Sequence, residues 1–101
     1  MVKRRKIIWP AFAKQQLRQM YDHIRKDSPK NALKVRNAIV AATLELPEHP
    51  NMHPADKYRT SNENGEFRAF ELFHYRIAYQ VTKESITIVR VRHTSMEPLS
   101  Y

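Results

Sequence analysis

Arginine is the residue type in this sequence with the clearest capacity for chemistry. Arg76 follows Tyr75 in one alternating segment, and Arg90 and Arg92 lie two residues apart in another. A guanidinium group presents a planar fork of donors that matches the oxygens of phosphate and carboxylate groups. Arg76 is therefore a candidate phosphate contact. The alternative is a solvated arginine on a sheet face, paired with Glu71.

His93 and Tyr101 are the other side chains near these arginines with useful chemistry. An imidazole titrates near neutral pH, so His93 could act as a general acid or base. Its alternative role is that of a polar residue at a strand end, which holds the turn that follows. Tyr101 could stack on a nucleic-acid base, or it is a terminal residue without fixed contacts.

Metal and cofactor chemistry have little support in the sequence. His49 and His53 have the spacing of two ligands on a helix, but Pro47, Pro50 and Pro54 argue against a helix there, and no third ligand is evident. The chain has no cysteine and one glycine, so it has neither a thiolate site nor a glycine-rich phosphate loop. We expect no metal and no small-molecule cofactor.

The charge balance favours an anionic partner. The chain of 101 residues has a net charge of +8, and residues 1–50 hold 11 Lys and Arg against 4 Asp and Glu. Such a field attracts nucleic acid, the ribosome or an acidic protein, although it also serves solubility alone. No segment approaches the roughly 20 apolar residues of a membrane span. The absence of cysteine fits the cytosol, and we expect a cytoplasmic protein.

The first half of the chain predicts a short strand and a helical hairpin. Residues 5–9 read as a strand that Pro10 ends, and apolar residues recur at helical spacing over residues 11–26. Ser28 and Pro29 suit the cap and first position of a second helix, which extends to residue 46. The short connection predicts antiparallel packing of the two helices.

The second half predicts a sheet. Residues 47–65 form a loop in which 57–59 could extend as a strand, and strands follow at 66–73, 75–81 and 86–93. The short connections favour an antiparallel meander. The sequence thus predicts one α+β domain over residues 1–101, in the order β-α-α-β-β-β. The helical hairpin covers one face of a small, mainly antiparallel sheet.

Strand alternation predicts where the arginines point. Arg76 shares a face with Ala78 and Gln80, opposite the apolar residues of its strand, and should look outward. In the last strand, alternation places two isoleucines and two arginines on one face: Ile86, Ile88, Arg90 and Arg92. Val89, Val91 and His93 then lie on the other face. A strand that is apolar on both faces lies centrally in its sheet.

In this order, the motifs resemble the RelE/ParE superfamily of toxins from bacterial type II toxin–antitoxin systems, over about residues 6–93. The markers are Trp9 at the end of the first strand, the Ser-Pro start of the second helix, and the phrases at residues 75–79 and 86–93. Members often have glycine before the Tyr-Arg pair, where this chain has His74. Histidine tolerates a positive φ better than β-branched residues do, so the turn should survive with some strain.

The resemblance implies a toxin with one of two activities. The RelE branch cuts mRNA on the ribosome, and here that activity would use Arg76, Arg92, His93 and Tyr101 as catalytic residues. The ParE branch, associated with plasmid stabilisation, inhibits DNA gyrase by binding. Glu66 and Glu71 repel RNA and occupy a strand that is lysine-rich in RNA-cutting members, so the ParE branch is favoured.

The resemblance also implies two binding surfaces. The target would meet cations of the sheet, for which the candidates are Arg68, Arg76, Arg90 and Arg92. A cognate antitoxin segment would lie across the helices and the sheet, and it would suit the helical hairpin, whose residues 10–46 hold seven Lys and Arg against three Asp and Glu. The candidates there are Lys14, Arg18, Arg25 and Arg36. A third possibility is a catalytically silent binding module of the same fold.

Overall fold

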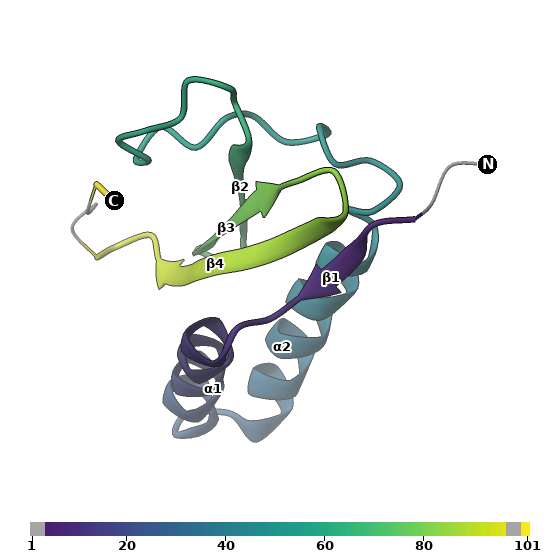
Figure 1. Cartoon of the computed structure of the whole chain (residues 1–101). Coiled ribbons are helices and arrows are strands. Elements are labelled where there is room, and N and C mark those ends of the chain that lie inside the picture. Colours follow the sequence, from purple (N-terminus) through teal and green to yellow (C-terminus); the bar gives the residue numbers. More distant parts are fainter. Residues whose placement is uncertain (1–3, 97–99) are drawn as a thin grey trace.

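Two helices and four strands make up the described chain in the computed structural model, which covers residues 4–96 and 100–101. The elements are β1 (Lys6–Ile8), α1 (Ala11–Arg25), α2 (Pro29–Leu44), β2 (Phe67–Leu72), β3 (Tyr75–Val81) and β4 (Ser85–His93). The predicted α+β order, β-α-α-β-β-β, is confirmed. Figure 1 shows both helices on one side of the sheet. No helix within the described ranges is long and apolar enough to cross a membrane.

The helical hairpin forms as its capping residues predict. The Ser28 hydroxyl accepts a hydrogen bond from the Asn31 backbone N–H at 3.1 Å, and Pro29 occupies the first helical position of α2. Pro10 precedes α1 in an extended conformation. Ala13 and Met20 of α1, with Val35 and Ile39 of α2, enter the hydrophobic core against the sheet.

The sheet is mixed, with the strand order β1-β4-β3-β2. β1 pairs in parallel with the start of β4, and the other pairs are antiparallel. β4 has β1 on one side and β3 on the other, as predicted for a central strand. Where β1 has ended, the Gln16 side chain of α1 accepts a hydrogen bond from the Val91 N–H at 2.8 Å.

A register shift in β4 makes the predicted orientation of Arg90 and Arg92 wrong. Ile88 lies opposite Tyr79 and Arg90 lies opposite Ala78, so Val89 is the extra residue of a β-bulge. The bulge reverses the alternation from this point. Ile86 and Ile88 therefore share the core side with Val91, whereas both arginines lie on the opposite side.

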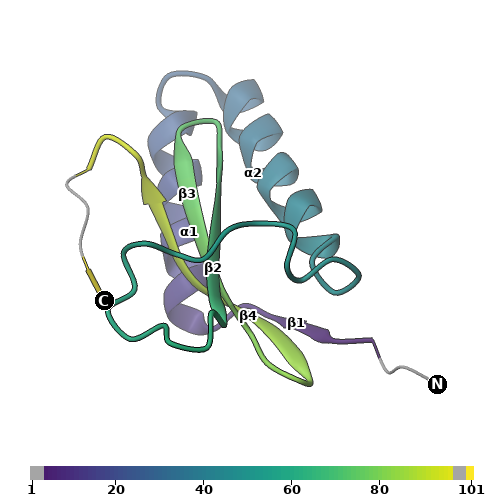
Figure 2. The same ribbon diagram turned by 90° about the horizontal axis from the view of Figure 1, so that it is seen from above.

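The sheet consequently has two different faces. The face toward the helices carries the apolar core; Tyr75, Ile77, Tyr79, Ile86, Ile88 and Val91 belong to it. The other face, which we call the outer face, carries Arg76, Arg90 and Arg92. The long loop after α2, residues 45–66, begins on the core side, where Pro50 and His53 contact Tyr79 and Phe70, and Asp56 then reaches Arg76 of the outer face. Figures 1 and 2 show this loop approaching the C-terminal residues.

Two connections depart from regular structure in informative ways. The β2–β3 turn has two residues with positive φ, Phe73 at 50° and His74 at 67°, which confirms the strained turn expected at His74. The predicted extension over residues 57–59 is wrong, because that segment is a turn. Instead, Ala55 forms a single bridge to Arg68.

Candidate functional site

Three arginines converge on the outer face because of their register. Glu71, Arg76 and Arg92 lie opposite one another across β2, β3 and β4, and the next row holds Ala69, Ala78 and Arg90. The two alanines are buried. We call Arg76, Arg90 and Arg92 the outer arginine cluster.

Asp56 of the loop is a buried anion that contacts this cluster through Arg76. Its side chain is completely buried and forms an ion pair with Arg76, with Oδ1 at 3.0 Å from Nη2. The same Oδ1 accepts the Tyr58 backbone N–H at 3.1 Å. Arg76 also binds Glu71, through Nη1, at 3.1 Å, which is the pairing named in the alternative interpretation of this residue. The fork of Arg76 is thereby fixed between two carboxylates, one buried and one exposed.

The hydrogen bonds to Asp56 outweigh the cost of burying its charge. Burial alone raises a carboxyl pKa, but the Tyr101 hydroxyl, the Tyr58 N–H and the Arg76 guanidinium stabilise the carboxylate. The net effect is to lower the pKa of Asp56 below its ordinary value of 3.8. Asp56 is therefore ionised at neutral pH and acts as a fixed acceptor.

Tyr101 is packed into the site, so a terminal residue without fixed contacts is the wrong interpretation. Its hydroxyl donates to Asp56 Oδ2 at 2.5 Å. Its backbone pairs with the loop, because Tyr101 N–H donates to the Tyr58 carbonyl at 2.9 Å and Thr60 N–H donates to the Tyr101 carbonyl at 2.7 Å. Burial and the Asp56 charge raise the pKa of the Tyr101 phenol, so it remains a hydrogen-bond donor.

Arginine and aromatic side chains alternate across the outer face. The Arg59 guanidinium carbon lies 3.9 Å from the Phe67 ring centroid and 5.0 Å from that of Tyr101. On the Tyr101 ring, Arg90 lies at 4.0 Å. Arg76 lies 4.9 Å from the Tyr58 ring centroid. These cation–π contacts hold the guanidinium planes in place.

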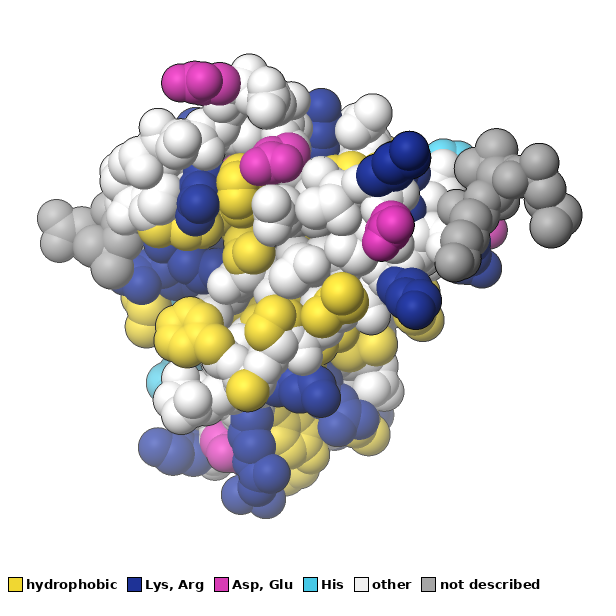
Figure 3. Space-filling model, viewed as in Figure 1, with side chains coloured by type: hydrophobic (Ala, Val, Ile, Leu, Met, Phe, Trp, Pro, Cys, Tyr) yellow, Lys and Arg dark blue, Asp and Glu magenta, His cyan; other side chains and the backbone are white. Residues whose placement is uncertain are grey.

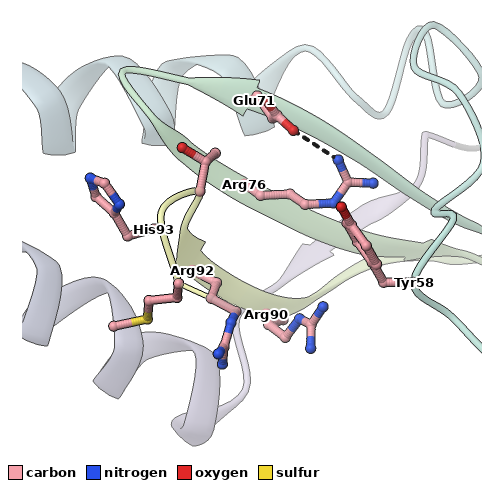
Figure 4. Close-up of a pocket in the computed structure, with 8 residues that line it drawn as sticks. Tyr58, Glu71, Arg76, Arg90, Arg92 and His93 are labelled. Carbon is pink, nitrogen blue, oxygen red and sulfur yellow. Dashed lines mark hydrogen bonds and ion pairs between the residues drawn. The ribbon is translucent and has the colours of Figure 1, made fainter. Parts of the chain in front are cut away.

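A shallow pocket opens between these side chains. Its lining residues are Tyr58, Glu71, Arg76, Arg90, Arg92, His93, Thr94 and Met96. In Figure 4 the three arginines border this pocket, whereas the His93 ring points away from them. His93 Nδ1 instead meets the Ser95 N–H at 3.0 Å. The contact places His93 in its alternative role, as the residue that holds the turn after β4.

Arg68 does not join the outer arginine cluster. It lies opposite Tyr79 in the β2–β3 register, on the side of the sheet that faces the helices. Its Nη1 donates to the His53 carbonyl at 2.6 Å. Among the four predicted target-binding arginines, Arg68 therefore fastens the loop and the other three share the outer face.

The four predicted antitoxin contacts lie on the hairpin, and all four are exposed; they are Lys14, Arg18, Arg25 and Arg36. The first three fall on one stripe of α1 by helical spacing. Arg36 of α2 joins this stripe because its guanidinium lies 5.4 Å from the Tyr21 ring centroid. Figure 3 shows Lys and Arg side chains gathered over the helices, beside apolar ones.

Sequence reasoning missed Asp56, Tyr58 and Arg59, which all lie in the loop. The length of this loop, residues 45–66, could have indicated a functional segment, because long loops without regular secondary structure inside small domains commonly carry function. Within the described ranges, no group of three His, Cys, Asp or Glu side chains could hold a metal ion.

Comparison with known families identifies the class of protein that has this helical hairpin and mixed sheet as toxins of type II toxin–antitoxin systems. The sequence profile of the family "ParE toxin of type II toxin-antitoxin system, parDE" matches residues 7–98. The chain belongs to this family. No curated protein matches the sequence significantly.

A solved structure has the same fold as this chain. A chain from the "Chromosomal ParDE TA system from P. aeruginosa" superposes with a TM-score of 0.69 and is 24% identical in sequence. The match covers 90% of this chain and 97% of that chain. The similarity therefore extends over the helical hairpin and the sheet together.

Proposed function

We propose that this ParE toxin inhibits DNA gyrase by binding it through the outer arginine cluster, and that a cognate antitoxin neutralises it by covering the helical hairpin. Gyrase acts in the cytoplasm, so the toxin would act there too. In this proposal no bond is made or broken by the toxin, and its effect is to hold the enzyme–DNA complex in one state.

The observation that carries the proposal is the ion pair between Asp56 and Arg76. The buried carboxylate of Asp56 accepts hydrogen bonds from Arg76, Tyr58 and Tyr101, so both of its oxygens hold these groups in position. It fixes the nearby guanidinium groups before any partner arrives, which reduces the entropy lost on binding. His93 points away from the cluster (Figure 4). These positions support a role of the face in binding.

Exposed apolar and basic residues on the helical hairpin support its role as the antitoxin-binding surface. Leu33 and Leu44 of α2 are 44% and 56% exposed. They lie on the same side of the helix as Arg36, at spacings of three and eight residues. An amphipathic acidic segment would cover the leucines and pair with the arginine stripe.

Induced expression without antitoxin tests the proposal. We expect growth arrest with trapped gyrase–DNA cleavage complexes and intact mRNA. Arg92→Gln should abolish the trapping, whereas Lys83→Gln, in the exposed β3–β4 turn, should not. Arrest without trapped complexes contradicts the gyrase target, and no arrest at all indicates a silent binding module.

One observation favours a second candidate, a ribosome-dependent endoribonuclease. Arg76, Arg92 and Tyr101, three of the four residues expected for that activity, share the outer face. Codon-dependent mRNA cleavage that is lost in Arg76→Ala would establish this activity and contradict gyrase inhibition. A small acidic partner encoded beside the gene is expected under both candidates.

A further inference from the structure

We propose that the His53 ring is an acid-sensitive latch, which holds residues 48–53 of the long loop against the core side of the sheet and releases them when the ring is protonated. We call residues 48–53 the latch segment. This inference goes beyond the proposed function, because it concerns the loop itself and requires no partner.

The latch segment lies between two firmly attached parts of the loop. Before it, the Leu46 side chain is completely buried. After it, the loop pairs with the edge of β2, because the Pro54 carbonyl accepts the Ala69 N–H at 3.2 Å. The Asp56 N–H likewise donates to the Phe67 carbonyl at 2.8 Å. These attachments fix both ends, so the segment between them can open without unfolding the sheet.

His53 provides the aromatic contact between the latch segment and the sheet. Its ring stacks on Phe70 of β2, with 4.7 Å between the ring centroids, and meets the Tyr79 ring of β3 edge-on at 6.3 Å. Both partners belong to the hydrophobic core. The Tyr79 hydroxyl also donates to the Pro50 carbonyl at 3.0 Å, and Arg68 Nη1 donates to the His53 carbonyl at 2.6 Å. The segment is therefore attached through an imidazole ring packed against apolar surface.

The charged form of this ring is disfavoured in the packed position. Burial lowers the pKa of His53 below its ordinary value of 6.5, although the negative charge of Glu45, at the end of α2, opposes the effect. Arg68 of β2 and Tyr79 of β3 also face this residue, and Arg68 brings a second positive charge to it. The packed ring is therefore neutral at neutral pH.

Acid should consequently open the latch segment. A histidine whose pKa is lower in the packed state stabilises that state fully above its ordinary value, here 6.5. This contribution is lost as the pH falls from 6.5 through the lower pKa of the packed ring. The loss begins well above the range in which Asp56 titrates, because the ordinary pKa of that carboxyl is 3.8 and the fold lowers it.

Amide hydrogen exchange of the purified chain at about pH 7.5 and about pH 5.5, on either side of the ordinary histidine pKa, tests the latch. The reporter is the Met52 N–H, which donates to the His49 carbonyl at 3.1 Å, and the reference is the Asp56 N–H. After correction for the intrinsic effect of pH on exchange, we expect the protection of Met52 to fall several-fold at the lower pH, while Asp56 keeps its protection. His53→Phe should abolish this fall because it keeps a ring on Phe70 that cannot be protonated. His49→Phe, the same change at an exposed position of the segment, should retain it.

Two further measurements bear on the same inference. Glu45→Gln should enlarge the fall in protection, because it removes the charge that favours the protonated ring in its packed position. In the wild type, the NMR signals of the His53 ring should lose their ring-current shift from Phe70 as the ring is protonated. This titration needs no variant, so it remains decisive if His53→Phe does not fold.

The latch is overturned by any of four results. Equal protection of Met52 at both pH values shows that the segment does not open, and an undiminished fall in His53→Phe shows that another group controls it. A fall of the same size at Asp56 shows that opening is not confined to the latch segment. A ring-current shift that persists after His53 is protonated shows that the charged ring stays packed.

Discussion

Asp56 and Tyr101 are 45 residues apart in the chain, and their side chains meet in a hydrogen bond of 2.5 Å. The contact joins the loop after α2 to the end of the chain, above the outer face of the sheet. Arg76 binds the other oxygen of the same carboxylate at 3.0 Å. Asp56 thus connects three distant segments, and several predictions about stability depend on it.

Removing the Asp56 carboxylate should destabilise the protein strongly. In Asp56→Ala, Arg76 loses the partner that neutralises it, and Tyr101 loses its acceptor. Breaking a buried ion pair by removing one partner costs about 3–5 kcal/mol; Arg76 keeps Glu71, so we expect about 3 kcal/mol in urea unfolding. The matched control is Asp22→Ala, which breaks the exposed Arg18–Asp22 pair. With the change in helix propensity included, it should lower the free energy of unfolding by about 0–1 kcal/mol. Similar losses in both variants would contradict the assigned role of Asp56.

The lowered pKa of Asp56 predicts a specific acid sensitivity. A carboxyl group whose pKa is lower in the folded state stabilises the protein fully above its unfolded value, here 3.8. That contribution is lost as the pH falls from this value through the folded pKa. The difference in unfolding free energy between the wild type and Asp56→Asn should therefore shrink below about pH 4. Parallel curves for the two proteins down to about pH 2 would contradict the pKa direction.

The Tyr101 hydroxyl should contribute separately from its ring. Tyr101→Phe keeps the ring beside Arg59 and Arg90 but removes the donor to Asp56, so we expect a loss of about 1.5–3 kcal/mol, typical of a hydrogen bond to a charged group. Tyr21→Phe, which retains its ring contact with Arg36, should change stability little. In an Asp56→Asn background the effect of Tyr101→Phe should be smaller. Full additivity of the two changes would contradict direct coupling.

The β2–β3 turn holds strain that a substitution can remove. Phe73 and His74 both have positive φ, and a residue with a Cβ in this region costs about 1–2 kcal/mol relative to glycine. The double variant Phe73→Asn/His74→Gly supplies the pair preferred in such turns and should raise the free energy of unfolding by about 1 kcal/mol. The converse control is Gly65→Ala at φ 65°, where the added Cβ meets nothing within 4 Å, and it should lower stability through the backbone alone. A double variant that is less stable than the wild type would contradict the strain.

The fold was largely predictable because its determinants are local. Ser28 and Pro29 define the start of α2, helical spacing defines the hairpin, and short connections define the meander. Strand alternation predicted that Arg76 points outward, and its pairing with Glu71 was one of two interpretations left open by the sequence. These signals come from residues close together in sequence, where backbone geometry limits the possibilities.

The candidate site was only partly predictable because it depends on distant contacts. The bulge at Val89 reverses the strand alternation, and apolar residues on both faces of β4 gave no sign of where this happens. Nothing in the sequence distinguished Asp56 from its neighbours in the loop. Its importance comes from Arg76 and Tyr101, which lie 20 and 45 residues further along the chain and both bind its carboxylate. Such packing cannot be read from periodicity.

The most direct test of the central claim is the affinity of the purified toxin for DNA gyrase, measured for the wild type, Arg92→Gln and Lys83→Gln. Both substitutions remove one positive charge, but only Arg92 belongs to the outer arginine cluster. We predict that Arg92→Gln weakens binding about tenfold, or 1.4 kcal/mol, and that Lys83→Gln leaves the affinity near that of the wild type. Equal affinities for all three proteins, or no binding by the wild type, would contradict the claim that this face engages gyrase.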